Sequence, residues 1–210
     1  MANDKDQELP ANSLRRKYNA PPEELTDGNL TLRRWRLADG EASYEAARTN
    51  LDELIEWMTW ATKDYDLQSA QSFMTFSESC WENGTSFDYA AVLDGKVCGS
   101  FSLMNAEHGV GSDIGYWLAK PATGKGVATR ATKLLLKAAF DANFETVQIM
   151  HDVRNVKSEA IPKRLCFTYK ETNVGLNKGK EFDRKLWQLT RDEFLQRQEA
   201  AELNPTSTRR

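Results

Sequence analysis

The sequence is poor in the residues that form disulfides and metal centres. It has three cysteines, an odd number without any CxxC spacing, and its only histidines are His108 and His151. Neither histidine belongs to a His-x-x-x-His or Cys-His cluster, so a zinc site built by the protein would lack ligands. We therefore expect reduced thiols and no bound metal.

Long hydrophobic runs and an excess of basic charge are also missing. No apolar stretch approaches the roughly twenty residues needed to span a bilayer, and none near the N-terminus resembles a secretion signal. The net charge is −3 and the sequence pI is about 5.6, whereas a dedicated nucleic-acid binder needs a basic face that displaces counterions. We expect a cytoplasmic protein with neither a membrane nor a nucleic-acid partner.

What is present suffices for one substantial core. The chain has 210 residues, of which 40% are apolar, and one domain is typical of this size. Prolines and charges in residues 1–25 predict a mobile arm; residues 26–195 would form the domain, and residues 196–210 the polar end of a helix and a tail. Hydrophobic periodicity predicts strands at 30–36, 87–93, 97–104, 113–118, 145–151, 165–171 and 181–190, and helices at 39–48, 50–60, 67–82, 123–143, 156–164 and 191–203.

The most informative segment runs from Ser112 to Ala131. A short apolar strand is followed by a proline-broken turn, a Gly-Lys-Gly loop and a helix. Gly124 and Gly126 allow a tight turn in which successive N–H groups face one way, and the helix start adds its positive dipole end. The pattern is neither GxGxxG nor a Walker A loop. It predicts a site for a phosphate-bearing cofactor, although an isolated Gly-Lys-Gly is more often an ordinary helix start.

The loop resembles the acyl-coenzyme A binding motif of GNAT-type N-acetyltransferases, Q/R-x-x-G-x-G/A after a strand. Gly124, Gly126 and Ala128 supply the small residues of that motif, whereas its leading Arg or Gln is absent. The resemblance implies acetyl-CoA as co-substrate, with the loop holding its pyrophosphate.

A second block, from Val147 to Phe167, is similar to the same family. The matching residues, in order, are Asn155, Ser158, Ala160, Arg164 and Phe167. Cys166 stands where the family usually has Gly. A side chain there disfavours positive φ, so we expect the local turn to differ. Cys98 and Cys166 are expected to be buried small hydrophobes in strands.

The two ends of the domain resemble the RimJ/RimL group, which acetylates ribosomal proteins. The similar segments are 30–35 (LTLRRW), 51–60 (LDELIEWMTW) and 186–194 (LWQLTRDEF), so the resemblance covers roughly residues 30–195. It implies an α/β GNAT fold with flanking helices, whose central, mostly antiparallel twisted sheet of about six or seven strands is splayed at the cofactor site.

The resemblance also implies which residues hold the co-substrate. The exposed backbone of a strand would pair with the pantetheine amides, and an Asn side chain would bind the same arm. The expected cofactor-binding residues are Tyr116, Trp117, Leu118, Thr123, Gly124, Lys125, Gly126, Val127, Ala128, Thr129 and Asn155.

Two residues are candidates for catalysis. Ser158 would hydrogen-bond or protonate the departing thiolate, and Asp113, at the entry of its strand, would act as the base or orient the amine. Plainer roles also fit the residues: a helix cap for Ser158, a solvated strand entry for Asp113, and a turn for Asn155.

The implied activity is transfer of an acetyl group from acetyl-CoA to a primary amine, by direct attack in a ternary complex. The α-amine of a protein or peptide is favoured, because its reference pKa of about 7.7 to 8.0 lies far below the roughly 10.4 of Lys. Acetylation of a small amine, such as an antibiotic or a polyamine, is one alternative, and a non-catalytic acyl-CoA-binding module is another. A monomer and a homodimer both fit the sequence.

Overall fold

The computed structural model describes residues 18–105 and 111–203. The strands are β1 (Glu24–Asp27), β2 (Leu30–Arg34), β3 (Ser86–Leu93), β4 (Lys96–Asn105), β5 (Ser112–Leu118), β6 (Thr146–Asp152), β7 (Thr168–Asn177) and β8 (Lys180–Thr190). The helices are α1 (Gly40–Arg48), α2 (Leu51–Trp57), α3 (Leu67–Asn83), α4 (Val127–Asp141), α5 (Val156–Arg164) and α6 (Arg191–Leu203), with short 3-10 turns η2 (Leu37–Asp39) and η3 (Lys120–Ala122). None of the helices in these ranges is long and apolar enough to cross a membrane.

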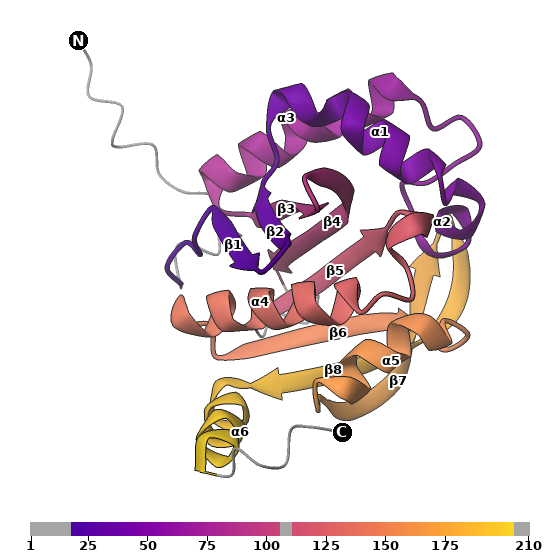
Figure 1. Cartoon of the computed structure of the whole chain (residues 1–210). Helices are drawn as coiled ribbons and strands as arrows, with labels where there is room; N and C mark the ends of the chain where they lie inside the picture. Colours follow the sequence, from indigo (N-terminus) through magenta and orange to yellow (C-terminus); the bar gives the residue numbers. More distant parts are fainter. Residues whose placement is uncertain (1–17, 106–110, 204–210) are drawn as a thin grey trace.

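The described strands form one mixed sheet, in the order β1-β2-β3-β4-β5-β6-β8-β7 (Figure 1). Neighbouring strands are antiparallel except β5 and β6, which are parallel and pair only at Ser112↔Val147 and Asp113↔Gln148. Beyond Asp113 the two strands diverge, so the mostly antiparallel sheet is splayed, as the sequence predicts. The sheet has eight strands rather than six or seven, because β1 pairs with β2 along its whole length.

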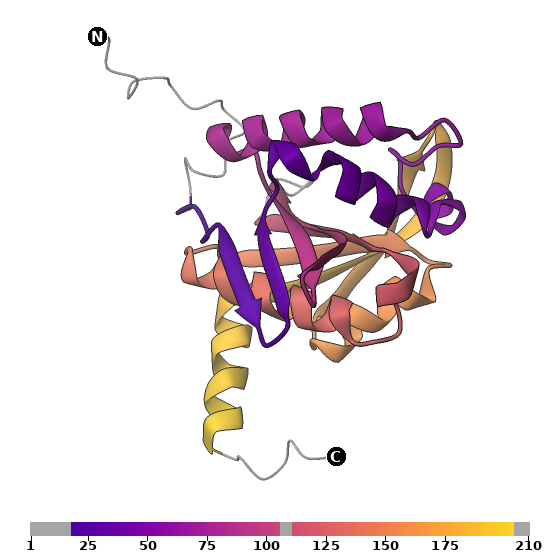
Figure 2. The same ribbon diagram turned by 45° about the horizontal axis from the view of Figure 1, so that its top comes forward.

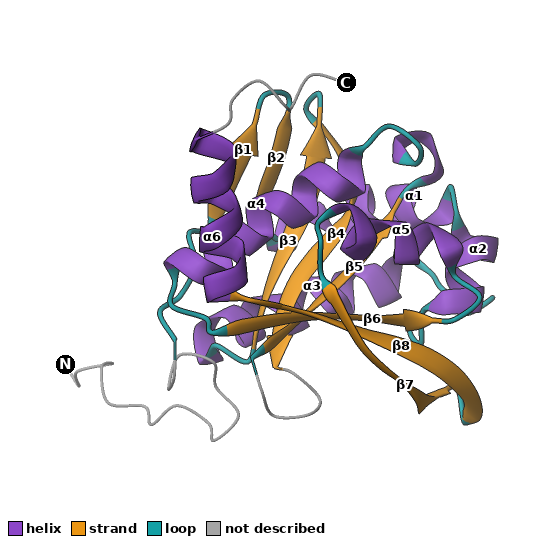
Figure 3. Cartoon of the chain, turned by 90° about the horizontal axis from the view of Figure 1, so that it is seen from below, coloured by secondary structure: helices purple, strands orange, loops and turns teal. Residues whose placement is uncertain are grey.

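Helices cover both faces of the sheet. The pair α1 and α3 lies on one face, whereas α4 and α5 lie on the other (Figures 2 and 3). The largest buried cluster joins Phe87, Tyr89 and Phe101 from the sheet to Leu135 and its neighbours on α4. This packing fixes α4 on the sheet, with its N-terminus at the point where β5 and β6 separate.

The packed part of the chain begins before the domain start expected at residue 26. Tyr18 is buried and its ring stacks on Phe144, with centroids 4.1 Å apart. The Asn19 amide donates to the Ala142 carbonyl (3.0 Å), and β1 already starts at Glu24. Residues 18–25 are therefore attached to the sheet and to the end of α4, while residues 1–17 of the expected arm lie outside the described residues.

The turn after α5 keeps the backbone that a glycine would give it. Cys166 has φ 59°, its amide donates to the Lys163 carbonyl (3.2 Å), and the Phe167 amide donates to the Pro162 carbonyl (2.9 Å). These two bonds form a Schellman motif, which needs a left-handed residue at this position. The expectation of a different turn is wrong: the hydrogen bonds hold Cys166 in a strained conformation, and its side chain is exposed between α5 and β7 rather than buried in a strand.

Candidate functional site

A cavity of about 830 Å³ lies where β5 separates from β6. Its walls are the C-terminal half of β5, the loop and first turn of α4, the helix α5, and α2 from the opposite side. It brings together most of the residues predicted from the sequence, namely Tyr116, Trp117, Leu118, Thr123, Gly124, Gly126, Val127, Ala128, Thr129, Asn155 and Ser158. Lys125 belongs to the same loop but does not line the cavity.

The glycine loop has the geometry of an anion cradle. Gly124 and Gly126 have φ 73° and 76°, and Gly126 directly precedes α4. No atom lies within 4 Å of the position that a Cβ would take at either glycine, so the loop faces open space. The first N–H groups of a helix have no partners within it, and the helix dipole adds positive potential there. The start of α4 therefore presents donors to an anion in the cavity.

One positively charged side chain stands beside this helix start. The guanidinium of Arg164, at the end of α5, donates to Thr129 Oγ1 over 3.3 Å, and both residues line the cavity. Arg130, which also lines it, is held by Asp27 instead, with Nε and Oδ2 2.7 Å apart. Arg164 is thus a cation beside the start of α4 that the predicted site omits, although its place in the second sequence block marked it.

The strand β5 offers a backbone edge to the cavity. On one side it pairs with β4, with Tyr116 opposite Phe101 and Trp117 opposite Ser100. On the other side its pairing with β6 ends at Asp113. The edge at Tyr116, Trp117 and Leu118, which is not paired with β6, lines the cavity, and its peptide groups can pair with the amides of an extended ligand, as an added strand does.

A hydroxyl pair connects β5 to α5 across this gap. Tyr116 Oη lies 2.9 Å from Ser158 Oγ and 3.3 Å from the Ser158 carbonyl oxygen. Burial raises the pKa of Tyr116 to about 12, so its phenol is protonated near neutral pH. Asn155 is the N-cap of α5, because its Oδ1 accepts the Ser158 amide over 2.9 Å. The helix cap that the sequence allowed for Ser158 is therefore Asn155, and Ser158 supplies the amide that Asn155 caps.

Asp113 lies outside the cavity. It is buried at the start of β5, opposite Met104 on β4 and Gln148 on β6. It lies three positions before Tyr116, which is about 10 Å along a strand. The acid that does line the cavity is Glu53 on α2, which forms a 2.7 Å ion pair with Lys157 on α5. The sequence pattern gave no sign of Glu53, since the pair joins residues far apart in the chain.

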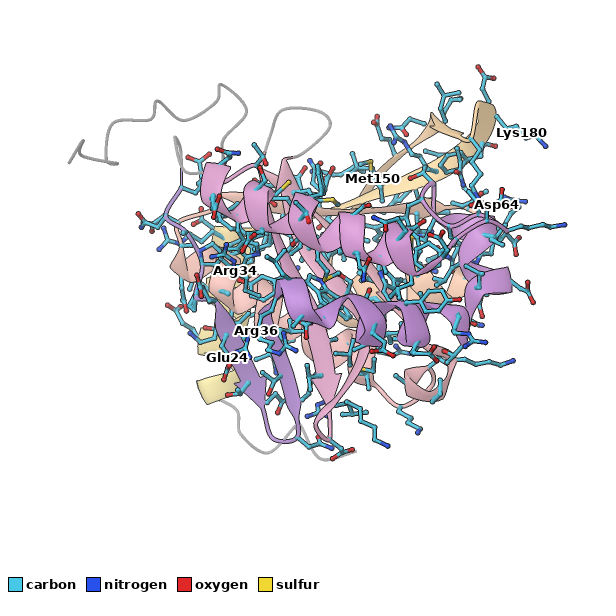
Figure 4. All side chains as sticks on the ribbon, turned by 90° about the horizontal axis from the view of Figure 1, so that it is seen from above. Glu24, Arg34, Arg36, Asp64, Met150 and Lys180 are labelled. Carbon is cyan, nitrogen blue, oxygen red and sulfur yellow. The ribbon has the colours of Figure 1, made fainter. Side chains whose placement is uncertain are left out.

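The hairpin of β7 and β8 closes the end of the molecule next to α2. Its tip residue Lys178 donates from Nζ to the carbonyls of Ile55 and Ala61, each at 2.7 Å. Seen from above, the hairpin end marked by Lys180 lies beside the loop that carries Asp64 (Figure 4). The α2 wall of the cavity is therefore supported from outside.

Comparisons with known proteins agree with this geometry. The family model described as an acetyltransferase (GNAT) domain matches residues 29–168. A curated protein of Bacillus subtilis (strain 168), "Putative ribosomal N-acetyltransferase YdaF", is 31% identical in an alignment of 147 residues that covers 66% of this chain and 78% of that protein.

Two solved structures share the fold. The ribosomal L7/L12 α-N-protein acetyltransferase RimL, in complex with coenzyme A, is 18% identical with a TM-score of 0.74, covering 81% of this chain and 99% of that one. The microcin C7 self-immunity acetyltransferase MccE, in complex with acetyl-CoA and AMP, is 23% identical with a TM-score of 0.73, covering 78% and 93%.

Proposed function

Because this chain belongs to the GNAT acetyltransferase family, we propose that it acetylates the α-amine of a protein or peptide, using acetyl-CoA in a ternary complex. The chain is an acetyl-CoA-dependent N-acetyltransferase of the RimJ/RimL-like group. The identity of the amine is the proposed part, and it rests on which groups line the cavity.

The observation that carries the proposal is the joining of a phosphate cradle and an open strand edge in one cavity. The α4 start and Arg164 suit a pyrophosphate, and the β5 edge suits the two amides of a pantetheine arm. Acetyl-CoA supplies a thioester whose carbonyl carbon a neutral amine attacks while the sulfur departs. The chain would hold that thioester at the end of β5, next to Ser158, whose hydroxyl would donate to the departing sulfur.

The lining favours an amine that loses its proton easily. Among the described residues that line the cavity, Glu53 is the one carboxylate, and it is paired with Lys157. None of these described lining residues is a buried acid that could deprotonate a Lys side chain. An α-amine, with a reference pKa of about 7.7 to 8.0, is neutral without such a base in roughly a tenth of the molecules at pH 7 and about half at pH 8. A polycationic amine would need several acids, which this lining does not provide.

Two further expectations stand as parts of the same proposal. A protein or peptide acceptor with a free N-terminus is found in the cytoplasm, where we place this enzyme. The RimL and YdaF names point to ribosomal proteins as the acceptor class. Cys166, which stands where the family usually has Gly, leaves the turn after α5 intact, so this substitution gives no support to the alternative of a non-catalytic binding module.

Thiol release from acetyl-CoA tests the acceptor class. The enzyme is supplied with a library of short peptides with varied first residues and free α-amines, with the same library blocked at the N-terminus but containing Lys, or with spermidine. We expect release only with free α-amines, and mass spectrometry should place one acetyl group on the first residue. Release with spermidine or with blocked peptides alone, or with none of the three, would contradict the proposal.

A further inference from the structure

The side chain of Tyr116 reaches across the splay to the serine of α5. Its Oη lies 2.9 Å from Ser158 Oγ, and both residues line the cavity. The pair joins residues 42 positions apart in the sequence, one on β5 and one on α5. Pairing of the Tyr116 backbone with a ligand gives no role to the hydroxyl group of its side chain.

The direction of the hydrogen bond follows from its length and from the chemistry of the two hydroxyls. The phenol has one hydrogen and two acceptors within reach, Ser158 Oγ at 2.9 Å and the Ser158 carbonyl oxygen at 3.3 Å; the shorter distance assigns this hydrogen to Oγ rather than to the carbonyl. A phenol is a stronger acid than an aliphatic alcohol, so the phenol is the better donor and the serine oxygen the better acceptor. The Tyr116 phenol stays protonated at neutral pH. With its lone pair engaged, Ser158 Oγ keeps its own hydrogen for a second partner. Donation into an oxygen also strengthens the donor on that oxygen.

Both ends of the bond are held in place. The Tyr116 ring stacks on Phe101, with centroids 5.6 Å apart and an interplanar angle of 24°. On the other side, Asn155 fixes the first turn of α5 through the Ser158 amide. A donor fixed before the reaction does not have to reorganise when charge develops, which is where such a donor helps most.

We propose that Tyr116 is a positioning residue that directs the Ser158 hydroxyl hydrogen toward the departing sulfur of the thioester. The inference rests on the proposed function only in that acetyl-CoA binds in this cavity; it does not depend on the acceptor. As the nitrogen–carbon bond forms, the carbon–sulfur bond breaks and its electron pair stays on sulfur. The Ser158 O–H donates a hydrogen bond to that thiolate, the surplus amine proton goes to solvent, and neither hydroxyl changes its charge.

The variant Tyr116→Phe keeps the ring and removes the donor. We expect kcat to fall about tenfold, while the KM for acetyl-CoA and the unfolding midpoint stay close to those of the unchanged protein. The matched control is Tyr89→Phe, which removes another sheet tyrosine hydroxyl, one that donates to the Pro22 carbonyl over 2.8 Å. This control should leave kcat unchanged. In a Ser158→Ala background, Tyr116→Phe should change kcat less than twofold, because its effect passes through Ser158.

A second readout uses coenzyme A alone. The thiol of bound coenzyme A is titrated by the ultraviolet absorbance of its thiolate, after subtracting the protein alone. We expect the bound thiol to titrate about one pH unit higher in Tyr116→Phe and in Ser158→Ala than in the unchanged protein, and unshifted in Tyr89→Phe. A merely structural link between β5 and α5 would not move this titration.

The outcomes distinguish failure of the positioning role of Tyr116 from failure of the proposed acceptor class. An unshifted thiol titration in Tyr116→Phe, or an equal loss of kcat with and without Ser158, overturns the positioning role. Failure of the α-amine peptides in the acceptor assay, with the thiol shift present, overturns the acceptor class and leaves the positioning role standing. If coenzyme A does not bind at all, both proposals fall.

Discussion

Glu53 on α2 and Lys157 on α5 form an ion pair, with Oε1 and Nζ 2.7 Å apart, that links two walls of the cavity. The two helices line the cavity from opposite sides, and the pair joins a side chain of one to a side chain of the other. The Lys157 side chain is 72% exposed and that of Glu53 35%. Exposed pairs of this kind stabilise a fold by less than about 1 kcal/mol, so its main effect is on the charge of the cavity.

Replacing Glu53 by Gln should tighten the binding of coenzyme A. The ligand carries several negative charges, and two unit charges about 10 Å apart in water interact by roughly 0.4 kcal/mol. Removal of the carboxylate also releases Lys157 as a cation. We expect the Kd for coenzyme A, measured by calorimetry, to fall about two- to fivefold at low salt and the difference to disappear near 1 M salt.

The control for this variant is Glu41→Gln, at the opposite end of α1 from α2. It changes the net charge equally and should leave the Kd unchanged. Weaker binding of coenzyme A by Glu53→Gln would mean that the ion pair is needed for the shape of the cavity. An equal change of Kd in both variants would mean that only the net charge of the protein matters.

Gly126→Asp should abolish coenzyme A binding. Gly126 stands at the start of α4 with φ 76°, and a side chain there enters open space in the cradle. An Asp would place a negative charge where the pyrophosphate is expected, and it would cancel the potential of the helix start. We expect the Kd to rise more than about 100-fold, since each 1.4 kcal/mol is a factor of ten.

Gly95→Asp provides a closely matched control. Gly95 has φ 78°, also with no atom within 4 Å of a Cβ position, but it lies in the turn between β3 and β4. Both substitutions force a residue with a side chain into the left-handed region, which costs about 1 to 2 kcal/mol. The two variants should therefore lose similar stability and differ only in coenzyme A binding. If Gly126→Asp still bound coenzyme A, the glycine loop would not be the binding site of the pyrophosphate.

Features set by neighbouring residues were predictable from the sequence. The Asp94-Gly95 turn joins β3 and β4 in the register expected of such a pair. The glycine loop lies between β5 and α4, and α3 ends at Gly84 with φ 65°. Each depends on the local backbone preferences of glycine and its neighbours, which can be read from the sequence.

Features set by contacts between distant elements were not predictable. Asp113 lies at the start of β5, the strand that does border the cavity, but β5 diverges from β6 only after this residue, so Asp113 stays in the paired part of the strand. Tyr116 was expected to contribute its backbone, because nothing in the sequence shows that α5 brings Ser158 to its phenol. Glu53 and the packing of Tyr18 on Phe144 likewise depend on how helices settle on the finished sheet.

Cys166→Gly should stabilise the protein. Cys166 holds φ 59° in the Schellman turn after α5, a conformation that costs residues with a side chain about 1 kcal/mol or more. Gly removes this strain, although it gains some entropy in the unfolded chain. We expect the free energy of unfolding to rise by about 0.5 to 1 kcal/mol in urea titrations. Cys166→Ala keeps the strain and loses only the thiol, so it should be close to neutral; a similar rise in both variants would contradict the strain argument.

His151 should make the fold less stable in weak acid. Its Nε2 accepts the Trp187 indole N–H over 3.0 Å, and its Nδ1 lies 2.8 Å from the Asp152 carbonyl, to which it can only donate. The ring is therefore neutral, with its proton on Nδ1. Burial lowers the pKa of His151, outweighing the Asp152 carbonyl and the nearby Glu159, while Lys185 lowers it further. A proton on Nε2 would also place an N–H of His151 against the indole N–H of Trp187, so their hydrogen bond would be lost.

The sign of the pH dependence follows from this lowered pKa. The unfolded chain takes up the imidazole proton below about pH 6.5, and the folded chain only at lower pH. Between the two values the unfolded state binds more protons, so the free energy of unfolding falls as pH falls, by up to about 1.4 kcal/mol per pH unit for one proton. Carboxylates contribute at lower pH, so His151 has to be isolated.

The isolating comparison is His151→Gln in a chain whose other histidine, His108, is also Gln. Both chains carry His108→Gln, and one of them also carries His151→Gln. Urea unfolding of the two chains is measured at pH 8, 7, 6 and 5. We expect Gln to accept the Trp187 N–H through its carboxamide oxygen, so the variant stays folded. Its stability should fall less between pH 7 and 5 than that of the chain with His151. Because the variant has no group that titrates in this range at that position, parallel pH profiles for the two chains would show that His151 is protonated equally in the folded and unfolded states.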